Sequence, residues 1–287
     1  MKIKAWILSA RPKTLPVAIC SVSIGIGLAY THGFLHMGYA CLTLMVAVLI
    51  QIGTNYANDY FDYQKGADTP DRVGPTRATQ AGWVTPEQMK VAFCLVFFLA
   101  FLGGIALVFR GGWPILLIGI LAILSGIWYT AGKYALGYLG LGDLFVLVFF
   151  GPVSVAGTYY IQTLHWSAQA WILGLSTGLF AMAILVVNNI RDVDHDALVE
   201  KKTLAVRLGV KWAKFEYNMA INMACFVPFF LFGTFKYLLL LMVLIPALKI
   251  KMTVWHQTGA VLNQALAQTG LLLILFTGLL LGLLVFF

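Results

Sequence analysis

The sequence predicts an all-α integral membrane protein, a bundle of helices that each cross a lipid bilayer. Hydrophobic residues make up 61% of its 287 residues, charged residues make up only 10%, and the mean hydropathy is +0.88. Soluble domains carry roughly a quarter of charged residues, so this composition excludes an ordinary soluble protein. We therefore expect a single polytopic transmembrane domain over residues 1–287.

Nine apolar segments have the length of a membrane-spanning helix, which needs about 20 mostly apolar residues. They are residues 15–31, 38–57, 91–109, 113–130, 143–163, 169–190, 215–234, 237–256 and 263–286. The first segment follows several basic residues, as a signal peptide would, but no cleavage site leads into a soluble domain, so we expect it to stay as an anchor. The eighth segment contains Pro246 and has the least defined ends.

Basic residues are distributed unevenly between the two sides of such a bundle. If the N-terminus is cytoplasmic, 17 of the 19 Lys and Arg residues lie in cytoplasmic segments, and only Arg110 and Lys236 lie outside. Because Lys and Arg near helix ends are retained on the cytoplasmic side, this orientation is the expected one. The net charge of +8 then reflects a basic face beside anionic membrane lipid, and no nucleic-acid partner is required.

Acidic residues gather on that same side, in two clusters that also contain asparagine. The first cluster consists of Asn55, Asn58, Asp59, Asp62 and Asp68, and the second consists of Asn188, Asp192 and Asp196. Both clusters repeat the pattern Asn-x-x-x-Asp directly after an apolar segment. Residues four apart share a helix face, so each cluster presents several oxygen ligands in one direction if the helix continues past the membrane.

Carboxylates that converge at one place repel each other unless a cation binds between them. Mg²⁺ takes one or two carboxylate oxygens and leaves positions for water and substrate phosphate. The four cysteines lie in apolar segments and His195 stands alone, which argues against zinc or copper. Bases follow both clusters, namely Lys65, Arg72, Arg77, Lys201, Lys202 and Arg207. They are suited to bind a diphosphate, although such acids and bases also pair with each other in solvated loops.

At this point the sequence resembles the intramembrane aromatic prenyltransferases of the UbiA superfamily. Its aspartate-rich motifs match NDxxDxxxxxD, from Asn58 to Asp68, and NxxxDxxxD, from Asn188 to Asp196. Within the family it is most similar to the menaquinone-pathway branch, which prenylates 1,4-dihydroxy-2-naphthoate. That similarity rests on "NDYFDYQKGADTPDRVGPTR", "GYLGLGD", "FFGPVSVAGTYYIQ", "NNIRDVDHDALVEKKTLAVRLG" and "LNQALAQTG".

The resemblance implies a nine-helix bundle around a central cavity, with the two motifs facing each other at its cytoplasmic mouth. It implies that two Mg²⁺ ions bind the diphosphate of a polyprenyl diphosphate. The metal ligands would be Asn58, Asp62, Asp192 and Asp196, assisted by Asn188, Asp59 and Asp68. The prenyl group would pass to the naphthoate ring with loss of CO₂ and diphosphate, giving demethylmenaquinol, and we expect this to occur at the bacterial inner (cell) membrane.

Further residues are candidates for contact with the substrates. Lys65, Arg72, Arg77 and Lys202 are the expected diphosphate contacts. Tyr129, Tyr159 and Tyr160 either orient the acceptor and shield the allylic cation or pack at the membrane interface. Asp143, in "GLGD", either acts as the base on the acceptor hydroxyl or caps the start of the next helix.

Two other functions remain open from the sequence. Family members that use 4-hydroxybenzoate, homogentisate or haem as acceptor share the aspartate motifs, so these motifs do not identify the acceptor. A cation-coupled transporter would also carry intramembrane carboxylates, but transporters place them near the bilayer midplane on broken helices. Here the carboxylates lie at one end of the segments beside arginines, which favours the prenyltransferase.

Overall fold

The computed structural model describes residues 2–69 and 72–286, and within these ranges the chain is helical with no β-strand. A helix lies over each of the nine predicted apolar segments. In chain order these helices are α2 (Leu15–Thr31), α3 (Met37–Gln64), α4 (Pro86–Gly111), α5 (Trp113–Trp128), α6 to α7 (Gly142–Thr163), α8 (Ala168–Arg191), α11 (Val210–Phe232), η3 with α12 (Phe235–His256), and η4 with α13 (Gly259–Phe286). The all-α fold class is confirmed.

Eight helices among the described residues are long and apolar enough to cross a membrane. The first of them continues back to Ile3, because α1 (Lys2–Ser9) precedes α2 almost without interruption. The ninth candidate, α5, has 16 residues and is shorter than the others. Nine crossings and a cytoplasmic N-terminus therefore stay predictions.

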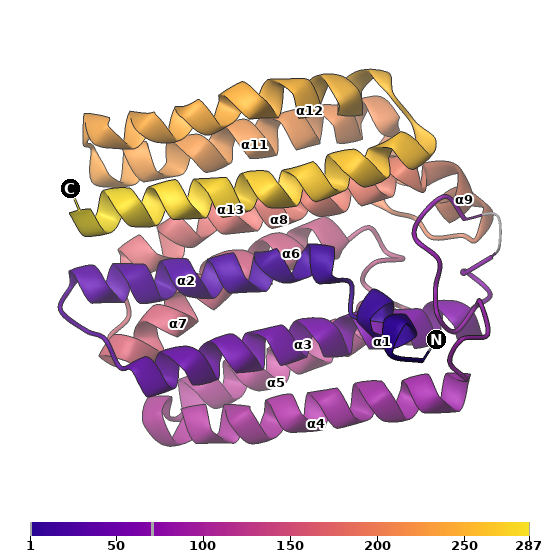
Figure 1. Cartoon of the computed structure of the whole chain (residues 1–287), viewed down its shortest axis with the longest axis horizontal. Helices are drawn as coiled ribbons and strands as arrows, with labels where there is room; N and C mark the ends of the chain where they lie inside the picture. The colour runs from indigo at the N-terminus through magenta and orange to yellow at the C-terminus, as the bar shows by residue number, and fades with distance from the viewer. Residues whose placement is uncertain (1, 70–71, 287) are drawn as a thin grey trace.

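The long helices lie side by side and run roughly parallel or antiparallel to one another (Figure 1). The chain reverses direction at nearly every connection, so α3 and α8 both end, and α4 and α11 both begin, at the same end of the bundle. The short helices α1 and α9 (Val193–Leu198) lie at this end, and the C-terminus lies at the opposite one. We call the end with α1 and α9 the charged end, because both acidic clusters lie there.

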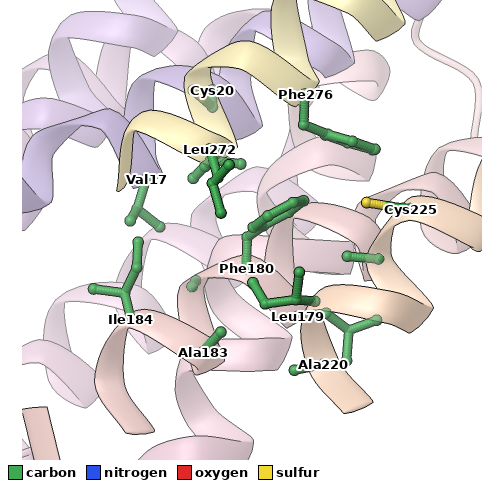
Figure 2. Close-up of a cluster of buried hydrophobic side chains, with 14 of the residues drawn as sticks. Val17, Cys20, Leu179, Phe180, Ala183, Ile184, Ala220, Cys225, Leu272 and Phe276 are labelled. Atoms are coloured by element: carbon green, nitrogen blue, oxygen red, sulfur yellow. The ribbon is translucent and has the colours of Figure 1, made fainter. Parts of the chain in front are cut away.

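Helix α8 forms the centre of the bundle. Its buried residues occur on all sides of the helix, as expected for a helix that has neighbours all round. Figure 2 shows Phe180 of α8 close to Phe276 of α13, with Val17 of α2 and Ala220 of α11 nearby. The rings of Phe180 and Phe276 lie 5.1 Å apart between centroids. This packing fixes the position of the second acidic cluster, which begins at Asn188 in the last turn of α8.

Several boundaries differ from the sequence prediction. Helices α4 and α11 each begin five residues earlier than predicted, and three further differences have a local cause. Helix α3 continues seven residues beyond residue 57, because the polar motif residues form one of its faces and pack inside the protein. Helix α8 does not continue through the second cluster but ends at Arg191, and Asp192 adopts a non-helical conformation before α9 begins. Between α6 and α7 the chain forms a π-helical segment, η2 (Phe149–Val153), around Pro152, which has no N–H to donate.

Candidate active site

A cavity of about 330 Å³ lies inside the bundle, between α2, α3, α4, α5, the α6–α7 unit and α8. Its charged and amide side chains gather at the charged end, together with two threonines. They are Arg11, Thr14, Gln51, Asn55, Asn58, Asp62, Arg72, Arg77, Thr130, Asn188 and Lys201. The remainder of the lining is mostly aliphatic and aromatic, so the cavity has a charged mouth and an apolar interior.

One face of α3 supplies the first part of the mouth. Gln51, Asn55, Asn58 and Asp62 all line the cavity, and their spacing of three or four residues places them on one side of the helix. The Asn58 Oδ1 atom accepts a hydrogen bond from Thr130 Oγ1 at 2.9 Å. The Thr130 hydroxyl thus holds the Asn58 side chain, and both residues line the cavity.

Asp59 points in a different direction, although the sequence predicted it as a metal ligand. Its carboxylate is buried and accepts hydrogen bonds from Ser9 Oγ at 3.3 Å and from the backbone N–H groups of Ala78 and Thr79 at 3.2 Å each. It does not line the cavity. Asp59 therefore ties α1 and the loop after residue 77 to α3, and the structure does not place it with the metal ligands.

The two acidic clusters meet across Arg72. Its Nη2 atom lies 2.9 Å from Asp192 Oδ2 in the second cluster, and its Nε atom lies 3.8 Å from Asp68 Oδ1 in the first. Burial disfavours the charged guanidinium, but Asp192 and Asp68 outweigh burial and raise the pKa of Arg72. One side chain thus connects motifs that are more than 120 residues apart in the sequence.

Arg77 connects two acidic residues within the first cluster. It lies 3.3 Å from Asp68 Oδ1 and 3.9 Å from Asp62 Oδ2. The other oxygen of Asp62 accepts a hydrogen bond from the hydroxyl of Tyr138 at 2.9 Å. Burial, together with the negative charge of Asp62, raises the pKa of Asp68 to about 7. The Asp68 Oδ2 atom is buried and has no partner in the described part of the chain.

The second cluster is held by Arg191, the last residue of α8. Its guanidinium donates to both carboxylate oxygens of Asp192, at 2.8 and 2.6 Å, and to Asn188 Oδ1 at 2.7 Å. Burial would raise the pKa of Asp192, but the bonds from Arg191 and the charge of Arg72 lower it. Asp196 has a different balance, since burial raises its pKa despite Lys201 at 3.5 Å.

The donors at the mouth fit magnesium. They are oxygen atoms of carboxylates and amides, the ligands that Mg²⁺ prefers, and Asp196 Oδ2, like Asp68 Oδ2, is buried without a hydrogen-bond partner. Among the described residues no group of three His, Cys, Asp or Glu side chains is arranged to hold an ion by itself. A Mg²⁺ site needs only one or two carboxylates when a substrate supplies phosphate oxygens, so this arrangement suits an ion that binds together with its substrate.

The structure brings some predicted substrate contacts to the cavity and leaves others outside it. Arg72, Arg77 and Tyr129 line the cavity, but Lys202 is exposed and the neighbouring Lys201 lines it instead. Lys65 also lies outside, with its Nζ atom 4.0 Å from the centroid of the Tyr138 ring.

Tyr159 and Tyr160 are at the opposite end of the bundle, contrary to their predicted position near the site. The Tyr159 hydroxyl is 2.8 Å from His32 Nδ1, just beyond the end of α2, and Tyr160 stacks on Trp166 with centroids 4.3 Å apart. These contacts agree with interfacial packing.

Asp143 is buried at the second position of α6 and does not line the cavity. The N-cap of α6 is Leu141, and no side-chain capping hydrogen bond forms there, but the Asp143 carboxylate lies in the first turn of α6, where negative charge stabilises a helix N-terminus. The structure therefore favours the role at the helix start over that of a base at the cavity.

The residues at the mouth that were not singled out from the sequence include Arg11, Arg191 and Tyr138. Arg11 lines the cavity, and its Nη2 atom is buried without a hydrogen-bond partner among residues 2–69 and 72–286. Arg191 and Tyr138 hold the two motifs as described above. In the sequence, Arg11 is one of the N-terminal basic residues that indicate the orientation of the protein in the membrane. Its left-handed backbone conformation (φ 51°) is not visible from composition.

The chain resembles known proteins in both sequence and fold. The model of the UbiA prenyltransferase family matches residues 18–266. The 1,4-dihydroxy-2-naphthoate octaprenyltransferase of Escherichia coli is 42% identical over 82% of this chain and 78% of that protein, and the one of Haemophilus influenzae is 39% identical over 79% and 77%.

Solved structures agree with this assignment at the level of fold. A UbiA homolog from Archaeoglobus fulgidus bound to GPP and Mg²⁺ superposes with a TM-score of 0.70 at 14% identity, over 96% of this chain and 97% of that one. A UbiA homolog from Aeropyrum pernix gives a TM-score of 0.71 at 14% identity, over 92% and 96%. The chain belongs to the UbiA prenyltransferase family.

Proposed function

We propose that this protein transfers a polyprenyl group from polyprenyl diphosphate to 1,4-dihydroxy-2-naphthoate, with release of diphosphate and CO₂, to give demethylmenaquinol. The observation that carries the proposal is the Arg72 bridge, which joins both aspartate motifs at the mouth of an apolar cavity. A charged mouth above an apolar interior matches a donor with a diphosphate head and a hydrocarbon tail. The naphthoate prenyltransferases named above support the choice of acceptor.

The diphosphate binds at the mouth, where cations line the cavity. Arg72, Arg77 and Lys201 contact the acidic residues there, and the unpartnered Arg11 Nη2 atom is free to donate to a phosphate oxygen or a carboxylate. Asp62, Asn58, Asp192 and Asp196 are the residues that would hold Mg²⁺, with Asn188 and Asp68 adjacent. When bound, Mg²⁺ neutralises charge on the leaving diphosphate.

Prenyl transfer then requires a charged mouth and a dry interior. The C1–O bond of the donor breaks and its electron pair leaves with the diphosphate, where the arginines stabilise the developing charge. The allylic cation that remains would react with water, and the apolar lining excludes water. The ring carbon that bears the carboxylate bonds to C1, and the pair released as CO₂ departs restores the aromatic ring.

The charge distribution suggests which side of the membrane the site faces. Most basic residues lie at the charged end or in the adjoining loops, and such residues are retained in the cytoplasm. We place the mouth at the cytoplasmic face of a bacterial inner membrane, where soluble naphthoate can reach it.

The proposal is tested with purified protein in detergent, Mg²⁺, dihydroxynaphthoate and a prenyl diphosphate, with the product identified by mass. We expect the mass of the prenylated ring less CO₂, and no product from Asp62→Ala or Asp192→Ala. Glu87→Gln, in the first turn of α4 and outside the cavity, is the control that keeps its activity. Activity of either aspartate variant at the parent level would disprove the metal assignment. Product from 4-hydroxybenzoate or homogentisate, but not from the naphthoate, would show that the protein uses the acceptor of another branch of the family.

A further inference from the structure

The cavity extends much farther along the bundle than the diphosphate site requires. On α3 its lining runs from Asn58 at the mouth to Thr43, and beside it the lining runs from Thr130 down α5 to Ile115. Each interval covers fifteen residues, which corresponds to about 22 Å at the rise of an α-helix. Because Thr130 donates a hydrogen bond to Asn58, the two intervals start at the same level and measure the same depth.

The deep end is mostly apolar. Val46, Leu107, Ile115 and Ile161 form a buried cluster there, which we call the floor cluster. All four line the cavity, and they come from α3, α4, α5 and α7. These four side chains bind hydrocarbon, and the hydroxyl of Thr43 at the same depth already donates to the backbone carbonyl of Tyr39.

Two glycines line the cavity just above the floor cluster, Gly104 of α4 and Gly119 of α5. A methyl group added at either position would meet no atom within 4 Å, so both glycines border open space. Most other helical glycines are different, since a methyl group at Gly103 or Gly126 would collide with a neighbouring side chain. Gly104 and Gly119 therefore leave open volume in the cavity because they lack side chains. The helices do not need glycine at these positions in order to pack closely.

The length of the cavity can be compared with that of a prenyl tail. With carbon–carbon bonds near 1.5 Å, an extended isoprene unit spans about 5 Å, so a depth of about 22 Å receives about four units. Gly119 lies eleven residues from Thr130, about 16 Å below the mouth. The first two isoprene units end above Gly119, and the third and fourth units lie beside it.

We propose that Gly104 and Gly119 form the binding site for the third and fourth isoprene units of the donor, and so set how much of the prenyl tail the enzyme recognises. The inference rests on the proposed prenyl transfer and adds the specificity of the deep cavity. Units beyond the fourth make no contact with these glycines, and discrimination among donors by this part of the cavity ends at the fourth unit.

The test compares donors of two and four isoprene units, geranyl and geranylgeranyl diphosphate, with dihydroxynaphthoate as acceptor. In Gly119→Leu and Gly104→Leu the ratio of kcat/KM for the longer donor to that for the shorter falls at least tenfold, because several buried methylene contacts are lost. The control is Gly278→Leu, on an exposed face of α13 with no neighbour within 4 Å and outside the cavity, and its ratio stays at the parent value. Leucine favours helix more than glycine does, so all three variants keep their helices.

The outcomes separate this inference from the function on which it rests. An unchanged ratio in both cavity variants overturns the role of the glycines while prenyl transfer stands. Equal losses with both donors also overturn it, since the substitution would then disturb the mouth and not the deep end. A parent enzyme that converts neither donor refutes the proposed function itself.

Discussion

Asp59 and Asp62 are three residues apart on α3, belong to the same motif, and yet have different surroundings. Asp62 lines the cavity and contacts Arg77 and Tyr138. Asp59 accepts three hydrogen bonds from Ser9 and from the backbone of residues 78 and 79. The motif identified both as ligands because sequence spacing places Asp59 and Asp62 on neighbouring parts of the helix surface but does not show which part faces the cavity. The same limit explains why Lys202 was chosen over Lys201, in a loop that has no regular period.

Asp59→Ala is expected to weaken folding and to leave magnesium dependence unchanged. The substitution leaves buried N–H groups of Ala78 and Thr79 without an acceptor, which costs about 1–3 kcal/mol for each such group. Thermal unfolding in detergent should therefore occur several degrees below the parent. The Mg²⁺ concentration for half-maximal activity should equal that of the parent. A higher Mg²⁺ requirement with normal thermal stability would show that Asp59 is a ligand after all.

At the scale of elements, most of the fold could be predicted from hydropathy, and the departures lie at helix ends. The nine apolar segments are all helical, because backbone groups in hydrocarbon must be hydrogen-bonded within the helix. A shared face for Asn58 and Asp62 requires α3 to continue past residue 57, and it does so to Gln64. The same expectation for the second cluster fails, because α8 breaks at Asp192. The π-helical segment before α7 depends on Pro152 and on its contact with α8, which only the tertiary structure defines.

Gly178→Ala is expected to separate α8 from this segment and to destabilise the protein. A methyl group at Gly178 would lie 2.3 Å from the carbonyl oxygen of Leu147 and 3.1 Å from Gly151 Cα, and backbone cannot move aside as a side chain can. Overpacking of this kind costs about 1–3 kcal/mol, so the melting temperature in detergent should fall by several degrees. Gly278→Ala, which meets no atom within 4 Å, is the matched control and should melt like the parent. Equal melting temperatures for the two variants would contradict the close approach of α8.

At the scale of the whole molecule, two motifs from different halves of the chain lie at one cavity mouth. The sequence contains both motifs but not the distance between them. Four-residue spacing predicts a common face within each cluster and says nothing about how the clusters face each other. The core around α8 supplies that relation, since α8 packs on α2, α11 and α13 and so positions Asp192 near the end of α3. Arg72 then completes the contact.

A double-mutant cycle on Arg72 and Asp192 tests this relation directly. Among the described residues, Asp192→Asn leaves the buried Arg72 with only its 3.8 Å ion pair to Asp68, and Arg72→Gln leaves Asp192 paired with Arg191 alone. Each single variant should therefore cost less than the ~3–5 kcal/mol that is lost when a buried charge keeps no partner. The double variant removes both charges, so its loss of stability should be smaller than the sum of the two single losses, by about 1–3 kcal/mol of coupling. Unfolding is measured without Mg²⁺ or substrate, so that the cycle reports on the ion pair alone. Additive losses would mean that Arg72 and Asp192 are not in contact, and the shared mouth, together with the prenyl transfer proposed there, would lose its main support.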